Sequence, residues 1–406
     1  MIRGIWMWPE NVFLFGAEKI ISFLKKAGFT DIYFLTKGLS GKTAFPSSFA
    51  PHAYGRDLLK EVIFYAHRQS MKVHAWFTSA SDEHYKSLFP ESGRAHFSRG
   101  KDKGLISFKD EGYLAYLKSI VSEVVSNYPV DGVHLDYIRY NHMLYGWDDK
   151  DISSYEAFGA DKDELFSLIQ KSFFSDNSDE SENIFSLYKN GNPSLKAFFE
   201  SRKTDVLKFA KEIVSSALSV RSSIFLSSAV MPEGAYSDHS FADLHYGQVY
   251  GDLSPLFDYL VPMAYSKAYG KNDRWVNMIG ENLKSKNIPF VMGLQAYDNC
   301  EGRITQNDIK ALSGISSKGY ALFREGEFAF VYEDSGMRIY NNTPYTITKI
   351  ALASDKGNEE ISVCIHPHES IEIHSSYIPD CICAFSQNTD VCVFYDKSLF
   401  ALGAIP

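Results

Sequence analysis

The sequence predicts an α/β fold, namely a (β/α)8 barrel of the TIM type with an insertion after its fourth strand and a small C-terminal β-sandwich-like module. Short apolar runs alternate with amphipathic helical stretches over roughly the first 325 residues, where eight runs have strand character. Beyond about residue 330 the helical stretches disappear, and short alternating runs follow one another between turn residues. A doubly wound open sheet is the alternative, but no Gly-x-Gly-x-x-Gly turn follows any apolar run. The count and order of the runs therefore favour the barrel.

The first half of the expected barrel contains four strands separated by loops and amphipathic helices. The run Lys72-Val-His-Ala-Trp-Phe-Thr78 is typical, because it is short, apolar and rich in residues that strands prefer. The expected strands cover 3–8, 30–36, 72–78 and 131–137, and the expected helices cover 17–27, 57–69 and 111–127.

The second half begins after an irregular stretch at about 141–193, rich in Asp, Ser and Asn, which we interpret as an insertion after strand four. The pattern resumes with helices at 195–220, 275–286 and 306–316 and strands at 224–230, 258–265, 289–296 and 319–323. We expect a barrel domain over 1–325 and a β-sandwich-like domain over 326–406, with strands near 346–352, 360–365, 370–373, 382–385 and 391–395. No clear helix follows the eighth strand, so the second domain should pack directly against the barrel.

Charge and composition exclude several classes of partner. The net charge is −9 and the 41 Lys and Arg residues are scattered, so nucleic acid is not an expected partner. There is no apolar stretch long enough to span a membrane and no visible signal peptide, so we expect no membrane association. The 5 cysteines are an odd number, and Cys381-Ile-Cys383 lacks a zinc-site spacing, which favours free thiols and a cytoplasmic location. The sequence leaves the oligomeric state open.

No metal or other cofactor is expected. Asp82-Glu-His84 follows the third strand and Asp238-His239 follows the fifth, but neither group has a third ligand at a diagnostic spacing.

The fourth strand ends in the polar group that points most clearly to chemistry. Side chains alternate along a strand, so His134 and Asp136 share a face, which is the barrel interior if Val133 and Leu135 meet the helices. The active sites of such barrels lie at the carboxyl ends of the strands, which is where Asp136 falls. The alternative is a structural pair between Asp136 and Arg139 that fixes the loop, and we favour the functional interpretation.

The run Asp131-Gly-Val-His-Leu-Asp-Tyr-Ile-Arg-Tyr140 resembles the signature of the glycosyl-hydrolase-like family 10 barrels, which are distantly similar to the α-amylase superfamily. Arg3-Gly-Ile-Trp6, Val73-His-Ala-Trp-Phe77 and Phe257-Asp-Tyr-Leu-Val-Pro-Met-Ala-Tyr265 fit the same resemblance, which covers about residues 1–325. It implies cleavage of glycosidic bonds by a pair of carboxyl groups, with carbohydrate as the partner.

By similarity to the amylase-like pattern, Asp136 would be the nucleophile of strand four. The partner acid is expected at another strand end, and we rank Glu233 first, Asp298 second and Glu325 behind them. Amylases carry an Arg two residues before the nucleophile, whereas this chain has His134 there. The analogy in mechanism is therefore incomplete.

Substrate-binding residues are expected at the same rim. Aromatic rings can stack on sugar faces, and polar groups on the strands can bind hydroxyls, although both kinds of residue also occur in barrel cores. The candidates are Trp6, His74, Trp76, His134, Tyr137, Arg139, Tyr265, Gln295 and Tyr297.

Three function classes follow from these observations. A glycoside hydrolase acting on an oligo- or polysaccharide is favoured. A transglycosidase or non-sugar hydrolase on the same fold is the second class, because one barrel supports many chemistries. A carbohydrate-binding barrel with a degenerate site is the third, and a functional pair of carboxyl groups would separate the enzymes from it.

Overall fold

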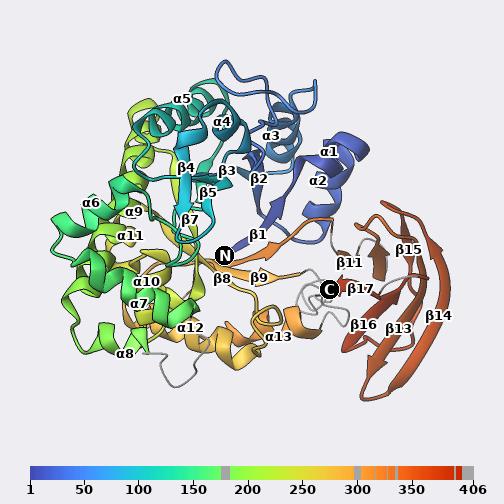
Figure 1. The fold of residues 1–406 in the computed structure, drawn as a ribbon. Helices are drawn as coiled ribbons and strands as arrows, with labels where there is room; N and C mark the ends of the chain where they lie inside the picture. The colour runs from blue at the N-terminus through green and yellow to red at the C-terminus, as the bar shows by residue number, and fades with distance from the viewer. Residues whose placement is uncertain are drawn as a thin grey trace.

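The computed structural model describes residues 1–174, 183–296, 303–315, 317–326, 328–333, 337–387 and 390–395. Its largest unit is a closed barrel with the strand order β1-β10-β9-β8-β7-β6-β3-β2, in which neighbouring strands are parallel (Figure 1). The barrel strands are β1 (Ile2–Met7), β2 (Asp31–Lys37), β3 (Lys72–Thr78), β6 (Gly132–Asp136), β7 (Phe225–Val230), β8 (Tyr259–Ala264), β9 (Met292–Gln295) and β10 (Gly319–Phe323). The predicted (β/α)8 fold is confirmed.

Several outer helices begin where a short polar side chain accepts a hydrogen bond from an amide of the first helical turn. Asp57 accepts one from the Lys60 amide at the start of α3 (Leu58–Arg68), and Asp110 accepts one from the Tyr113 amide before α5 (Glu111–Asn127). The other outer helices are α2 (Ala17–Lys26), α9 (Pro193–Val220), α12 (Asp273–Ser285) and α13 (Arg303–Ala311). Their apolar faces and the outward faces of the strands form one large core.

The connections after β1 and β3 contain extra elements before the outer helix of each unit. After β1, the short helix α1 (Pro9–Phe15) comes before α2. After β3 come α4 (Glu83–Leu88), the turn η1 (Pro90–Ser92) and a hairpin of β4 (Gly93–His96) and β5 (Gly100–Ile106), where the sequence indicated only a loop. Lys37 at the end of β2 forms an ion pair with Asp82 before α4, at 3.0 Å and fully buried. This pair joins two of the connections.

The insertion after β6 is helical. It contains α6 (Asp149–Ala157), α7 (Lys162–Phe174) and α8 (Ile184–Lys189), which pack on the first half of α9 and on α10 (Ser240–Tyr246). These helices enclose a second apolar cluster that includes Trp147, Phe198 and Leu244. Further short elements, η3 (Pro232–Ala235), α11 (Tyr250–Leu253) and η4 (Ser254–Leu256), follow β7.

The C-terminal strands form one seven-stranded sheet with the order β14-β13-β16-β17-β11-β12-β15. They are β11 (Phe328–Glu333), β12 (Met337–Tyr340), β13 (Ile347–Ser354), β14 (Gly357–Ile365), β15 (Ser370–Glu372), β16 (Cys381–Phe385) and β17 (Asp390–Phe394). Ile365 of β14 and Ile339 of β12 lie near opposite ends of the strand order but belong to one apolar cluster. The sheet therefore curls around a single core, as expected for a sandwich-like module. The division into two domains near residue 325 stays a prediction.

The sheet packs against the first helices of the barrel, beside α1 and α2 in Figure 1. The ring of Phe23 on α2 stacks on Tyr340 with centroids 3.7 Å apart, and the ring of Phe15 lies 3.8 Å from that of His368. Within the part of the chain that the structure describes, no helix lies between β10 and β11. The sheet therefore covers the barrel where an eighth helix would lie.

No helix among the described residues is long and apolar enough to cross a bilayer. Cys364 is exposed, and the sulfur atoms of Cys381 and Cys383 lie 3.8 Å apart.

Candidate active site

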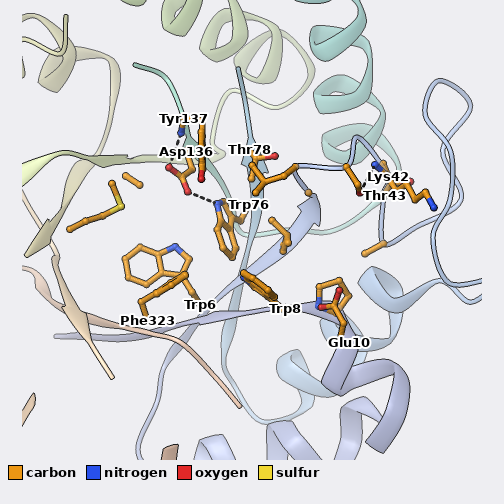
Figure 2. A pocket seen from close by; sticks show the side chains of 18 of the residues that line it. Trp6, Trp8, Glu10, Lys42, Thr43, Trp76, Thr78, Asp136, Tyr137 and Phe323 are labelled. Atoms are coloured by element: carbon orange, nitrogen blue, oxygen red, sulfur yellow. Dashed lines mark hydrogen bonds between the residues drawn. The ribbon is translucent and has the colours of Figure 1, made fainter. Parts of the chain in front are cut away.

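A pocket of about 470 Å³ opens at the carboxyl ends of the barrel strands (Figure 2). Its wall is mainly apolar and includes several aromatic rings, and its charged groups lie at the carboxyl ends of β1, β2 and β6. The residues discussed below that line it are Trp6, Trp8, Glu10, Lys42, Tyr54, Trp76, Asp136, Tyr137, Arg139, Tyr265, Tyr269 and Phe323. A concave, largely apolar site with a few convergent polar groups is the usual form of a small-molecule binding site.

Asp136 is the last residue of β6 and is 7% exposed. Its Oδ1 accepts a hydrogen bond of 2.7 Å from the Tyr137 amide, and its Oδ2 accepts one of 3.3 Å from Trp76 Nε1 (Figure 2). Burial raises the pKa of the Asp136 carboxyl, while the positive charge of Arg139 and the two hydrogen bonds oppose that rise. The net result is a raised pKa of the Asp136 carboxyl.

Arg139 does not form the structural pair considered from the sequence. Among the described residues, its guanidinium has no ion pair with Asp136 within 4.0 Å and lies instead over the ring of Tyr137, 4.9 Å from its centroid. Its buried Nε has no hydrogen-bond partner in the described part of the chain. Arg139 also lines the pocket.

Tyr137 turns the chain sharply out of β6. Its φ is +58°, a left-handed conformation that a bulky residue adopts at a cost of about 1–3 kcal/mol. The hydrogen bond from its amide to Asp136 helps to hold this conformation. The turn brings the side chains of Tyr137 and Arg139 to the pocket beside Asp136.

Glu233 lies in η3 after β7 and is 9% exposed. The hydroxyl of Tyr246 donates to its Oε1 at 3.5 Å, Tyr269 also hydrogen-bonds to it, and its buried Oε2 has no described partner. Burial raises the pKa of Glu233, and the hydrogen bonds and the charge of Arg139 oppose the rise. Glu233 does not itself line the pocket, but Tyr269 and Arg139, which interact with it, both do.

Three predicted substrate-binding residues lie in the barrel core and outside the pocket. His134 Nε2 accepts a hydrogen bond of 3.2 Å from Trp6 Nε1, so its other nitrogen carries the proton and donates to Ser227 Oγ at 2.9 Å. Burial lowers the pKa of His134 well below its usual value, which keeps the ring neutral. His74 pairs with Asp31 at 3.0 Å, and Gln295 accepts from the Ala268 amide at 2.9 Å. His74, His134 and Gln295 thus do not line the pocket, and their role in substrate binding stays a prediction.

The other predicted residues divide between the pocket and the rest of the chain. Trp6, Trp76, Tyr137, Arg139 and Tyr265 line the pocket as expected from their positions. Glu325 is buried outside it and accepts a hydrogen bond of 3.1 Å from Asn11. Tyr297 and Asp298 lie outside the described residues.

The sequence interpretation missed several lining residues, of which Glu10 matters most. Glu10 occurs in Trp8-Pro-Glu10 just past β1, a pattern close to Met231-Pro-Glu233 just past β7. The same reasoning that selected Glu233 could therefore have found it. Lys42 and Tyr54 come from the long connection after β2, and Tyr269 from the loop after β8, where no sequence pattern marks them. Within the described ranges, no group of three or more His, Cys, Asp or Glu residues is placed to hold a metal ion.

The sequence of this chain matches one protein family model and resembles a curated protein. Residues 112–306, which include Asp136 and Glu233, match the family model described as Glycosyl hydrolase-like 10, so the resemblance expected from the sequence is confirmed over that range. A curated relative, the glycosyl hydrolase YngK of Bacillus subtilis strain 168, is 22% identical over 341 residues, which cover 73% of this chain and 61% of the relative. The chain thus spans less than two thirds of that relative's length.

Solved structures share the barrel. The glycoside hydrolase domain of PgaB (BpsB) from Bordetella bronchiseptica superposes with a TM-score of 0.64 at 12% identity, covering 80% of this chain and 94% of that one. The β-galactosidase of Marinomonas ef1 has a TM-score of 0.57 at 13% identity, over 80% of this chain and 54% of that one. The α-L-fucosidase isoenzyme 2 of Paenibacillus thiaminolyticus has a TM-score of 0.55 at 14% identity, over 80% and 46%. At these identities the likeness is one of fold.

Proposed function

We propose that this protein is a glycoside hydrolase that cleaves a glycosidic bond of an oligo- or polysaccharide in the aromatic pocket at the mouth of its barrel. The observation that carries the proposal is the position of Asp136, a buried carboxylate at the end of β6 that lines the pocket and accepts hydrogen bonds at both oxygens. The match of residues 112–306 to a glycosyl-hydrolase-like family supports it.

Asp136 acts at the anomeric carbon in this proposal. An oxocarbenium-like transition state carries positive charge, which an adjacent carboxylate stabilises either as a nucleophile or through space. The Trp76 indole and the Tyr137 amide fix the carboxylate and favour its ionised form. Trp6, Trp76, Tyr265 and Phe323 offer ring faces and edges to the apolar sides of the sugar.

Glu233 is the proposed general acid, and because it does not line the pocket in this structure, the proposal requires its carboxyl group to turn toward the pocket when substrate binds. Its proton passes to the leaving oxygen as the bond from that oxygen to the anomeric carbon breaks, and water supplies the hydroxyl of the new reducing end. A raised pKa suits this role, because the acid must still hold its proton near neutral pH. Glu10 is the alternative acid, because it lines the pocket just after β1, three strands from the β6 strand that ends in Asp136.

The test is a screen of the wild type and matched variants on a panel of chromogenic glycosides and soluble polysaccharides. Asp136→Asn should lose at least ~10³-fold in kcat, and Glu233→Gln about 10²- to 10⁴-fold on polysaccharides, whose leaving groups need protonation. Glu18→Gln, on the exposed side of α2, is the control that should retain activity. A larger loss in Glu10→Gln than in Glu233→Gln would transfer the acid role to Glu10. Equal activity of Asp136→Asn and the wild type would refute the proposal.

A carbohydrate-binding barrel without catalysis is the second candidate. It is favoured because, of the catalytic carboxyl groups predicted from the sequence that the structure describes, Asp136 lines the pocket and Glu233 and Glu325 do not. Saturable binding of a glycan with no product after prolonged incubation would select this alternative.

A further inference from the structure

Aromatic side chains continue from the pocket onto the outer surface of the barrel mouth. Trp8, Tyr54 and Phe13, here called the outer platform, come from the segment after β1 and the connection after β2. Trp8 and Tyr54 line the pocket, and the ring of Phe13 lies 5.5 Å from that of Tyr54. In Figure 2, Trp8 lies on the side of the pocket toward Glu10 and away from Asp136.

Each ring of the outer platform is held by a charged neighbour. The Arg324 guanidinium lies 3.5 Å from the ring centroid of Trp8, and that of Arg56 lies 5.9 Å from the ring centroid of Phe13. The hydroxyl of Tyr54 donates a hydrogen bond of 2.8 Å to Glu10. A guanidinium covers one face of a ring and restrains it by cation–π attraction, while the other face can stay open.

Two residues of the outer platform are exposed to solvent. Trp8 is 36% exposed and Phe13 is 40% exposed, although both are large apolar residues. Exposed apolar groups that lie together beside a cleft are a feature of ligand-binding grooves. Polar groups lie beside these rings, because Glu10 accepts the hydrogen bond from Tyr54, and Arg56, whose guanidinium lies over the ring of Phe13, forms an ion pair with Glu61 at 2.6 Å.

Aromatic rings with hydrogen-bonding groups beside them fit a carbohydrate better than the apolar face of a protein. A pyranose offers C–H faces to aromatic rings and hydroxyls to the polar groups next to them. We propose that the outer platform binds the continuation of a glycan chain whose scissile bond lies in the pocket, so that the substrate is a polymer or a long oligosaccharide. The inference rests on the proposed function for the identity of the pocket's occupant.

Phe64 on α3 provides a matched control. It is 52% exposed and has the Arg68 guanidinium 5.3 Å from its ring centroid, but it does not line the pocket or touch the outer platform. Phe64 is thus an exposed phenylalanine with an arginine over its ring, like Phe13, but it lies away from the pocket. A difference in glycan binding between Phe13→Ala and Phe64→Ala therefore reflects where Phe13 lies.

The first experiment is affinity electrophoresis of the wild type, Phe13→Ala, Trp8→Ala, Phe64→Ala and Asp136→Asn through gels that contain hydroxyethylcellulose, laminarin, xylan, galactomannan or chitosan. At least one polymer should retard the wild type, Phe64→Ala and Asp136→Asn equally. Phe13→Ala and Trp8→Ala should bind that polymer about five- to tenfold more weakly, as loss of one stacked ring predicts. Failure of every polymer to retard the wild type, or equal retardation of Phe13→Ala, would overturn the platform.

The second experiment separates this inference from the proposed function. The ratio of kcat/KM on the retarding polymer to kcat/KM on a chromogenic monosaccharide glycoside should fall about five- to tenfold in Phe13→Ala and stay constant in Phe64→Ala. Full activity of Asp136→Asn would refute the hydrolase while leaving the binding result to stand. Conversion of a dimer to a monomer by Phe13→Ala, measured by sedimentation, would assign the surface to subunit contact and overturn the platform.

Discussion

Replacement of Lys37 by Met tests the architecture of the barrel mouth without any substrate. Lys37 ends β2 and is fully buried, with its ammonium 3.0 Å from the Asp82 carboxylate and 2.9 Å from the Ser81 carbonyl. It also donates to the Tyr113 hydroxyl at 3.3 Å. Burial lowers the pKa of Lys37, and the charge of Asp82 opposes that change. One ammonium group thus joins the connections after β2 and β3.

The expected cost follows from what the substitution leaves behind. Methionine fills most of the space of the lysine stem, so the main loss is the charge. Asp82 then remains as a buried carboxylate without its cation, for which about 3–5 kcal/mol is typical. Asp82→Asn in addition should recover about 2 kcal/mol, because the amide oxygen can still accept the hydrogen bond of 2.7 Å from the Tyr85 amide.

The assay is urea unfolding of the wild type, both single variants and the double variant, followed by tryptophan fluorescence and far-UV circular dichroism. The double-mutant cycle isolates the coupling energy between Lys37 and Asp82. A loss below about 1 kcal/mol in Lys37→Met, or a double variant less stable than both single ones, would refute the reasoning.

Three further predictions concern the core, the site and the C-terminal sheet. Trp76→Phe removes a hydrogen-bond donor to Asp136, so the pKa of the Asp136 carboxyl should rise further. Activity requires the ionised carboxylate and is lost as the pH falls through this pKa. The acidic limb of the pH profile of kcat/KM should therefore move up by about 1 pH unit. An unmoved limb would contradict this. His134 should remain neutral with its proton on Nδ1 at pH 5, as ¹⁵N NMR of the imidazole would report, and an imidazolium signal there would disprove the assignment. Phe23→Ala should cost about 2 kcal/mol by removing the ring that stacks on Tyr340, measured by urea unfolding, and a cost no larger than that of an exposed phenylalanine would count against the interface.

The barrel could be predicted because its strands are short apolar runs with a clear beginning and end. Each of the eight expected strands overlaps an observed one, and β3 and β10 have the expected bounds. The hairpin of β4 and β5 escaped prediction because Gly100-Lys-Asp-Lys-Gly104 is rich in residues that strands disfavour. Its pairing depends on tertiary contacts that no local pattern records.

The sequence predicted which residue lies at the centre of the candidate site, but not how far each side chain of β6 lies along the barrel axis. The period of two correctly put His134 and Asp136 on one face of β6, but it does not say how far each lies along the barrel axis. Two residues correspond to about 6.6 Å, which is enough to leave His134 among core side chains while Asp136 reaches the pocket. Glu10 and Tyr269 reach the site from separate connections, whose paths depend on packing rather than on local sequence.

The position of the C-terminal sheet has a consequence for synthesis of the chain. The barrel can close only when β10 has emerged, because β1 pairs with β10. Even then the side of α2 that carries Phe23 stays exposed until Tyr340 has been made and folded into β12. A nascent chain stopped before the sheet would therefore present a closed barrel with a bare apolar flank, the kind of surface that chaperones recognise and that promotes aggregation. The sheet is made after the barrel and completes the barrel's surface.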